Sequence, residues 1–289
     1  MKKKENCLMT DPKSDVKIFF PVDVSTEKEA REILAEVSPY VEVAKVGLEF
    51  MYHCDVSKAI ALIKEFNLPV MVDSKLIDIG PTVAGGIEGI LKHDIDYVNV
   101  MAVGGRPMVE QAVERVDNTF RKYGVKRPQI IAVTVLTSLK FEHLVELGIV
   151  PDREFLAKFG VYPPLGWKLP EDSGSQQDLI NEIVLRWARV SVNAGADIVL
   201  SSALELPRLA EEFEDIGLIN PGIRPPWSPP DHQGRKLSPY EAVISGAKNL
   251  VIGTPIRKPP KGMSREEAVK SIRADIARAE NELRMRGGK

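Results

Sequence analysis

The sequence contains few of the residues that mark secreted, zinc-bound or nucleic-acid-binding proteins. Its 289 residues include only two cysteines, Cys7 and Cys54, too few for a disulfide framework or a four-ligand zinc site. The four histidines have no metal-ligand spacing, so no metal site is expected. A formal net charge of −2 provides no basic field for nucleic acid and no polybasic surface for a membrane. We therefore exclude nucleic acid and membranes as expected partners and expect a cytoplasmic protein.

Long apolar runs are also missing. No window approaches the roughly 18 uninterrupted apolar residues of a membrane-spanning helix. The chain begins with charged residues, but no apolar run of signal-peptide length follows them. We expect residues 1–14 to form a flexible N-terminal tail.

From about residue 15 onward, short apolar, β-branched runs alternate with longer stretches of helical periodicity. Such near-continuous apolar runs suit parallel strands that are buried on both faces. An open sheet of eight strands would give a similar pattern, but eight strands with interleaved helices favour a (β/α)8 TIM barrel, a single α/β domain over residues 15–289. The expected strands are 17–24, 41–48, 68–75, 97–103, 129–136, 197–203, 216–223 and 249–256.

Several expected helices have recognisable starts. Thr26 and Glu29 form a capping-box pattern before an amphipathic run over 27–37. Pro81 and Pro107 suit the first turns of helices over 82–93 and 108–116. The last expected helix, 264–287, begins with acidic residues and ends with arginines, as the helix dipole favours.

Two irregular segments interrupt this alternation. Residues about 150–178 look like an insertion, and residues 224–240 are rich in proline. Both follow strands, so in a barrel both belong to the C-terminal face, where active sites lie. A functional loop and an inconsequential insertion fit 150–178 equally well, whereas a functional role is favoured for 224–240.

Charged residues gather near the ends of three consecutive strands. Asp73 and Lys75 are two residues apart near the end of strand three, so both should point to the same side. Asp78 follows in the loop, Asp23 lies near the end of strand one, and Lys45 lies inside strand two. An isolated Asp–Lys pair would more often be structural, but a lysine inside an apolar strand is costly unless it is paired. We expect Asp23, Lys45, Asp73 and Lys75 to alternate in sign at the barrel mouth.

The segment DSKLIDIGPT, residues 73–82, resembles the D-x-K-x-x-D-I-x-x-T signature of the orotidine 5′-phosphate decarboxylases, with every defining position present. Four further segments resemble other parts of that family in the same order along the chain. They are PVDVSTEKEA (21–30), VAKVGLEF (43–50), IIAVTVLTS (130–138) and INPGIRP (219–225).

The resemblance implies a carboxy-lyase that converts orotidine monophosphate to uridine monophosphate in de novo pyrimidine biosynthesis, without a metal or organic cofactor. It assigns catalysis to Lys45, Asp73, Lys75 and Asp78, with Lys75 as the proton donor. It also implies a homodimer with shared active sites, in which Asp78 and Thr82 reach into the partner's site. The remaining implied contacts are Asp23 on the ribose and Thr137 or Ser138 on the pyrimidine.

The phosphate-binding end departs from the family pattern. A glutamine usually follows the PGIRP-like turn, but Pro226 and Trp227 stand there and Gln233 is the nearest glutamine. The usual G-R-P-I motif of strand eight reads G-T-P-I here, so its arginine is replaced by Thr254. The candidate phosphate ligands are therefore Gly222, Arg224, Gln233, Arg235, Gly253, Thr254 and Arg257.

Two alternatives remain open at this point. One is a related lyase that acts on another sugar phosphate, of the magnesium-dependent keto-gulonate-phosphate decarboxylase or hexulose-phosphate synthase type. The hexulose-phosphate synthases characteristically have an acidic residue where Lys45 stands, and the intact ending from Asp78 to Thr82 also favours the first interpretation. The other is a non-catalytic barrel, against which the retention of four alternating charges argues.

Overall fold

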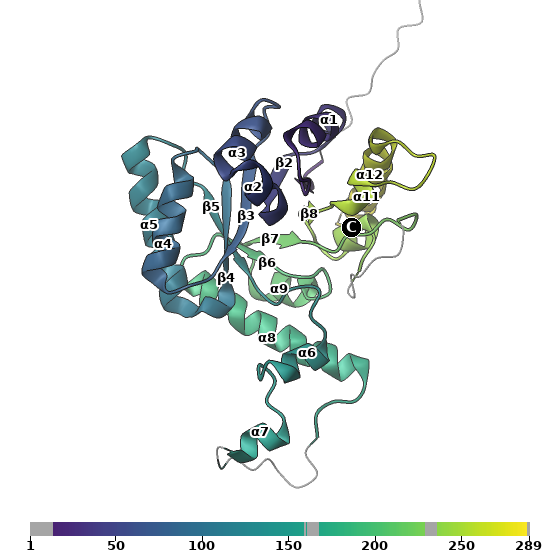
Figure 1. Cartoon of the computed structure of the whole chain (residues 1–289). Helices are drawn as coiled ribbons and strands as arrows, with labels where there is room; N and C mark the ends of the chain where they lie inside the picture. The colour runs from purple at the N-terminus through teal and green to yellow at the C-terminus, as the bar shows by residue number, and fades with distance from the viewer. Residues whose placement is uncertain (1–13, 159, 161–167, 229–235, 288–289) are drawn as a thin grey trace, which may run out of the picture.

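The computed structural model describes residues 14–158, 160, 168–228 and 236–287. Eight parallel strands close into a barrel in chain order, with helices around it (Figure 1). The strands are β1 (Lys17–Pro21), β2 (Val43–Gly47), β3 (Val70–Leu76), β4 (Tyr97–Met101), β5 (Gln129–Val133), β6 (Ile198–Leu200), β7 (Gly217–Asn220) and β8 (Asn249–Val251).

Closure of the sheet distinguishes the barrel from an open sheet. Phe19 of β1 pairs with Val43 of β2 on one side and with Val251 of β8 on the other. The first strand therefore has no free edge, and the predicted (β/α)8 TIM barrel is confirmed.

The helices follow the strands as the periodicity indicates. They are α1 (Glu27–Val37), α2 (Leu48–Cys54), α3 (Val56–Lys64), α4 (Gly80–Leu91), α5 (Gly105–Tyr123), α6 (Phe141–Glu146), α7 (Arg153–Lys158), α8 (Ser173–Asn193), α9 (Leu206–Glu212), α10 (Pro239–Ile244), α11 (Thr254–Arg257) and α12 (Arg265–Gly287), with short 3₁₀ turns η1 (Ser38–Tyr40) and η2 (Ala102–Gly104). The Oγ1 of Thr26 accepts a hydrogen bond from the amide of Glu29 at 3.2 Å, so α1 begins at the predicted residue.

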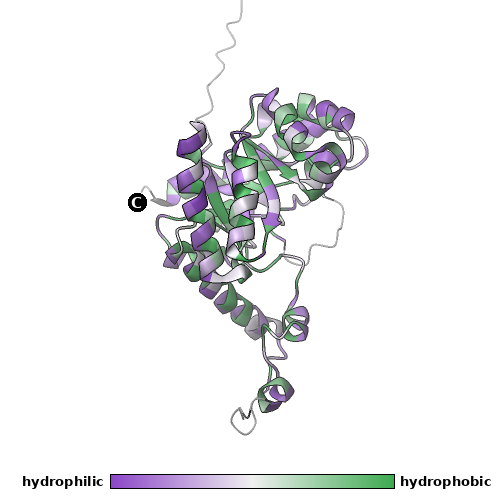
Figure 2. Cartoon of the chain, turned by 60° about the vertical axis from the view of Figure 1, so that its left-hand side comes forward, coloured by the Kyte–Doolittle hydropathy of each residue, from purple (hydrophilic) through white to green (hydrophobic). Residues whose placement is uncertain are grey.

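Alternation along the strands divides the apolar residues into two cores. One set fills the inside of the barrel, where the ring of Phe19 meets that of Tyr97 edge to face, with centroids 5.2 Å apart. A larger set lies between the barrel and the surrounding helices. The helices have mixed hydropathy and the strands are mainly hydrophobic, as Figure 2 shows. These two cores hold the strands and helices together beneath the barrel mouth.

The connection between β5 and β6 is the longest in the chain and contains the expected insertion. Its segment 150–178 includes α7 and the first residues of α8, while residues 159 and 161–167 lie outside the described part. Helix α7 projects away from the barrel (Figure 1). Segment 150–178 is therefore partly helical, and Asp172 caps α8 by accepting a hydrogen bond from the amide of Ser175 at 2.8 Å.

The proline-rich segment after β7 is anchored at both of its described ends. Ile223 forms a bridge with Leu237, and the indole of Trp227 donates a hydrogen bond to Ser271 of α12 at 3.1 Å. Residues 229–235, and with them Gln233 and Arg235, lie outside the described residues, as does the predicted tail up to residue 13.

Within the described part of the chain, no helix is long and apolar enough to cross a membrane.

Candidate active site

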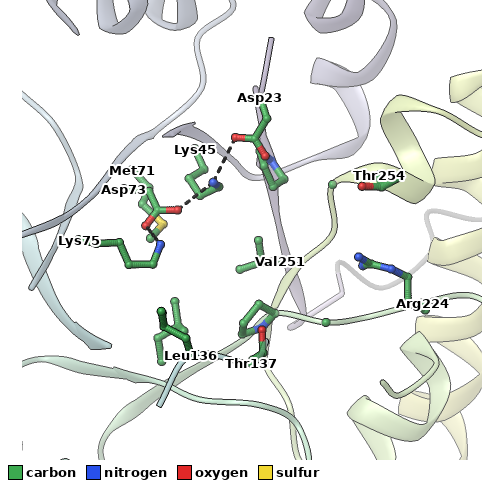
Figure 3. A pocket seen from close by; sticks show the side chains of 15 residues that line it. Asp23, Lys45, Met71, Asp73, Lys75, Leu136, Thr137, Arg224, Val251 and Thr254 are labelled. Atoms are coloured by element: carbon green, nitrogen blue, oxygen red, sulfur yellow. Dashed lines mark hydrogen bonds and ion pairs between the residues drawn. The ribbon is translucent and has the colours of Figure 1, made fainter. Parts of the chain in front are cut away.

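A cavity of about 230 Å³ opens at the C-terminal ends of the strands (Figure 3). Residues from most of the strands contribute to its wall: Pro21, Asp23, Lys45, Met71, Asp73, Lys75, Leu136, Thr137, Leu200, Pro221, Gly222, Arg224, Val251, Gly253 and Thr254. Nine of the fifteen residues predicted for catalysis or substrate binding are among them. They are Asp23, Lys45, Asp73, Lys75, Thr137, Gly222, Arg224, Gly253 and Thr254.

Four charged side chains form a continuous chain of ion pairs along one wall of this cavity. The Nζ of Lys45 lies 3.3 Å from an oxygen of Asp23 and 2.8 Å from one of Asp73. The other oxygen of Asp73 lies 2.5 Å from the Nζ of Lys75. The charges therefore alternate in the expected order, because β1, β2 and β3 are neighbours in the barrel.

The two central groups of the chain are the most buried. Side-chain exposure is 9% for Asp73 and 11% for Lys45, against 32% for Lys75. Burial alone would raise the pKa of Asp73, but the ammonium groups of Lys45 and Lys75 outweigh it and hold that pKa well below its usual range. Burial would lower the pKa of Lys45, but the carboxylates of Asp73 and Asp23 raise it. Asp73 and Lys45 are therefore both charged at neutral pH.

Lys75 reaches the cavity through an irregular end of β3. The pairing of β3 with β4 shifts register between Val72 and Leu76, and the backbone of Lys75 has φ = 50°, in the left-handed region. Non-glycine residues rarely adopt this conformation, and it is concentrated at functional sites. The amide of Lys75 donates a hydrogen bond to the side chain of Asn99 at 2.8 Å, and the Nδ2 of Asn99 donates to Asp73.

A glycine makes room for the Asp23–Lys45 pair. A Cβ atom at Gly47 would lie 2.6 Å from the Oδ1 of Asp23 and 3.1 Å from the Nζ of Lys45. Any side chain at this position would therefore displace the carboxylate of Asp23.

The opposite wall of the cavity is suited to an anion. Arg224 and Thr254 face the cavity from the side away from Lys75, as Figure 3 shows. The guanidinium of Arg224 donates one hydrogen bond to the carbonyl of Ile223 at 2.9 Å. Gly222 has φ = 82°, a conformation in which glycine is preferred, and its lack of a side chain leaves the main chain open to the cavity.

The remaining predicted residues lie elsewhere. Asp78 and Thr82 are exposed in the β3–α4 region, outside the cavity wall of the single protomer. An oxygen of Asp78 accepts a hydrogen bond from the amide of Ile79 at 2.6 Å. Ser138 is exposed beside Thr137, and Arg257 of α11 is half-buried, with no hydrogen-bond partner for its Nε among the described residues. The structure does not bring these four to the cavity, and Gln233 and Arg235 lie outside the described part.

Two residues that shape the site, Asn99 and Gly47, were not predicted from the sequence. Asn99 interrupts an apolar strand at the same parity as Tyr97 and Met101, so its side chain had to lie inside the barrel and find partners there. That signal was available in the sequence. The sequence around Gly47 has no comparable signal, because the need for a glycine there follows only from the position of Asp23 in space.

The chain is similar to known proteins over most of its length. The profile of the "Orotidine 5'-phosphate decarboxylase / HUMPS family" matches residues 17–153. Over 262 residues the chain is 33% identical to the orotidine 5′-phosphate decarboxylase of Moorella thermoacetica. The matched region spans 90% of this chain and 92% of that protein. The orotidine 5′-phosphate decarboxylase of Geotalea daltonii is 31% identical over 269 residues, 93% of this chain and 99% of that protein.

The chain belongs to the orotidine 5′-phosphate decarboxylase family. The crystal structure of the family member from Lactobacillus acidophilus superposes with a TM-score of 0.64 at 24% identity, over 90% of this chain and 99% of that one, and supports the same fold. Among the described residues, Arg224 is the arginine that lines the cavity, and it lies with Thr254 on the side away from Lys75 (Figure 3).

Proposed function

We propose that this protein is an orotidine 5′-phosphate decarboxylase, a carboxy-lyase that converts orotidine monophosphate to uridine monophosphate. The observation that carries the proposal is the buried carboxylate of Asp73, held between Lys45 and Lys75 at the wall of an open cavity. A fixed negative charge beside a partly exposed ammonium is what a reaction that removes carbon dioxide and leaves a carbanion requires.

The reaction begins with the carboxylate of the substrate next to Asp73. The bond between C6 and the carboxylate carbon breaks, the electron pair stays on C6, and carbon dioxide leaves as a neutral molecule. Repulsion between the two carboxylates is relieved as the negative charge leaves the carboxyl group. The ammonium of Lys75 stabilises the electron pair on C6 and then donates a proton to it, which gives uridine monophosphate. Solvent returns the proton to Lys75.

Lys45 and Asp23 position this centre. Lys45 holds the second oxygen of Asp73 at 2.8 Å, so the carboxylate cannot rotate away from the substrate. Asp23, with a side chain that is 34% exposed, is the group of the ion-pair chain that is available to a ribose hydroxyl. Thr137 lines the cavity after β5 and would contact the pyrimidine, whereas Ser138 is exposed beside it. Four further residues of the cavity wall would bind the phosphate: Gly222, Arg224, Gly253 and Thr254.

We further propose that the enzyme is a cytoplasmic homodimer in which each protomer completes the partner's site with Asp78 and Thr82. In a single protomer, both residues are exposed and lie outside the cavity wall. Ile77 and Ile79, which flank Asp78, are 54% and 71% exposed, an apolar surface that a second protomer would cover.

Mixing two inactive variants tests the shared site. Lys75→Ala and Asp78→Ala each remove one essential group, but a mixed dimer has one site that retains both. Random reassociation should then restore about a quarter of wild-type activity, because half of the dimers are mixed and each has one intact site. Two variants that stay inactive after demonstrated subunit exchange would contradict a shared site.

The substrate assignment is tested with the purified chain and orotidine monophosphate in the presence of a chelator, by following the change in pyrimidine absorbance. We expect turnover without added metal. Correctly folded protein with no turnover would contradict the assignment. Turnover that returned only with magnesium would instead favour a magnesium-dependent member of the wider family.

A further inference from the structure

The conformation of Lys75 needs support from outside its own strand. Its φ of 50° lies in the left-handed region, and the register shift in β3 interrupts the regular pairing with β4 between Val72 and Leu76. A lysine has no intrinsic preference for this backbone geometry, so its surroundings must hold it there. The direction of the ammonium group depends on that geometry.

Asn99 of β4 supplies the support. It is fully buried inside the barrel, on the same side of its strand as Tyr97 and Met101. Its Oδ1 accepts a hydrogen bond from the main-chain amide of Lys75 at 2.8 Å, and its Nδ2 donates one to the Oδ1 of Asp73. The ammonium of Lys75 binds the same oxygen of Asp73 at 2.5 Å. One carboxamide thus contacts both the backbone of the lysine and its carboxylate partner.

We propose that Asn99 is the positioning residue of the decarboxylating centre, fixing the backbone of Lys75 and the carboxylate of Asp73 relative to each other. This inference rests on the proposed function for its catalytic consequence. Asn99 does not line the cavity, so it acts through Lys75 and Asp73 rather than on the substrate.

The chemistry of the position requires an amide. The main-chain N–H of Lys75 needs an acceptor, and the carboxylate of Asp73 needs a donor. A carboxylate at position 99 would keep the acceptor but place a second negative charge beside Asp73. An aliphatic side chain would leave both partners without this contact in a buried environment. Asparagine meets both requirements with a single rigid group.

Three variants separate positioning from simple stabilisation. Asn99→Ala removes both contacts, Asn99→Asp removes the donor and keeps an acceptor, and Asn249→Ala is the matched control. Asn249 is also a barrel asparagine with a side-chain hydrogen bond, donated to the carbonyl of Leu218 at 2.9 Å, but it lies at the opposite end of the barrel. Its loss should change stability without changing the site.

We expect Asn99→Ala to lower kcat for orotidine monophosphate about a hundredfold while KM changes less than about threefold, because misplacement of a reacting group affects the chemical step. Asn99→Asp should also lower kcat, and the acid limb of its pH profile should move to higher pH than in the wild type, because the added carboxylate raises the pKa of Asp73. Asn249→Ala should keep the wild-type kcat. A kcat for Asn99→Ala within about threefold of wild type, in folded protein, would overturn the proposal.

Crystal structures of the wild type and Asn99→Ala provide a readout that does not depend on the reaction. In the variant, Lys75 should leave the left-handed region and its Nζ should leave Asp73. If the wild type fails to turn over orotidine monophosphate, the proposed function fails, and the pair of structures still decides the positioning role. A Lys75 that keeps its conformation and its contact without Asn99 would refute that role.

Discussion

Replacing Asp73 with a neutral residue should lower the stability of the fold as well as abolish activity. In Asp73→Asn, Asp23 is the one carboxylate of the described residues that still pairs with the buried ammonium of Lys45, at 3.3 Å and with a side chain that is 34% exposed. Lys75 loses its partner at 2.5 Å. At 2.8 Å and an effective dielectric constant of about 20, the Lys45–Asp73 attraction is about 6 kcal/mol before desolvation is subtracted. Removing one member of a buried pair costs about 3–5 kcal/mol, because the other charge stays buried.

That loss should lower the melting temperature by about 6–10 °C, at about 2 °C per kcal/mol for a chain of this size. Thermal and urea unfolding, followed by circular dichroism, measure it. Asp94→Asn is the control, since Asp94 pairs with Lys64 at 2.9 Å but is 55% exposed, and its loss should cost less than about 1 kcal/mol. A free energy of unfolding for Asp73→Asn within 1 kcal/mol of the wild-type value, as expected for the control, would show that the buried Lys45–Asp73 pair does not stabilise the fold.

The pH dependence provides a second check on the same prediction. The pKa of Asp73 is lower in the folded than in the unfolded state, so its ionised form stabilises the fold above the unfolded pKa of about 3.9. This contribution is lost as the pH falls below about 4 toward the folded pKa. The stability difference between wild type and Asp73→Asn should therefore be constant near neutral pH and shrink in acid. A difference that vanished already at pH 6 would contradict the depressed pKa.

Two further substitutions test the ends of the cavity. Gly47→Ala should raise KM for orotidine monophosphate about tenfold, because its Cβ would displace Asp23 from the ribose position; Gly89→Ala, which meets no atom within 4 Å, is the control and should leave KM unchanged. Thr254→Arg should lower KM by about tenfold, because it adds a second guanidinium on the same side of the cavity as Arg224 (Figure 3), where the phosphate would bind. An unchanged KM in steady-state assays of Gly47→Ala would contradict the contact of Asp23 with the ribose. An unchanged KM for Thr254→Arg would contradict the position of the phosphate beside Thr254.

The barrel could be predicted from the sequence because its signals are local. Each strand is a short apolar run, and the cap at Thr26 fixed the start of α1 to the residue. Helix α7, in segment 150–178, was harder to predict from the sequence, because it is short and lies away from the barrel, where little packing imposes a periodic pattern.

The site was predictable to the extent that it follows strand parity and strand order. Asp73 and Lys45 lie inside the barrel because they continue the inward-facing positions of Met71 and Val43. Lys75 reached the same cavity, but through a register shift that no spacing rule indicates. The contact of Asn99 with Lys75 joins residues 24 positions apart and depends on that irregularity, so the exact pairing could not be derived from the sequence.

In the proposed reaction, Lys75 delivers the proton to the carbon that loses carbon dioxide. The most direct measurement compares kcat of the wild type and Lys75→Ala with orotidine monophosphate, with carbon dioxide and uridine monophosphate both quantified. Because Asp73 keeps Lys45 at 2.8 Å, the variant should stay folded. We expect the wild type to release the two products in equal amounts and the variant to release neither at a measurable rate. A folded Lys75→Ala protein with wild-type turnover would contradict the claim.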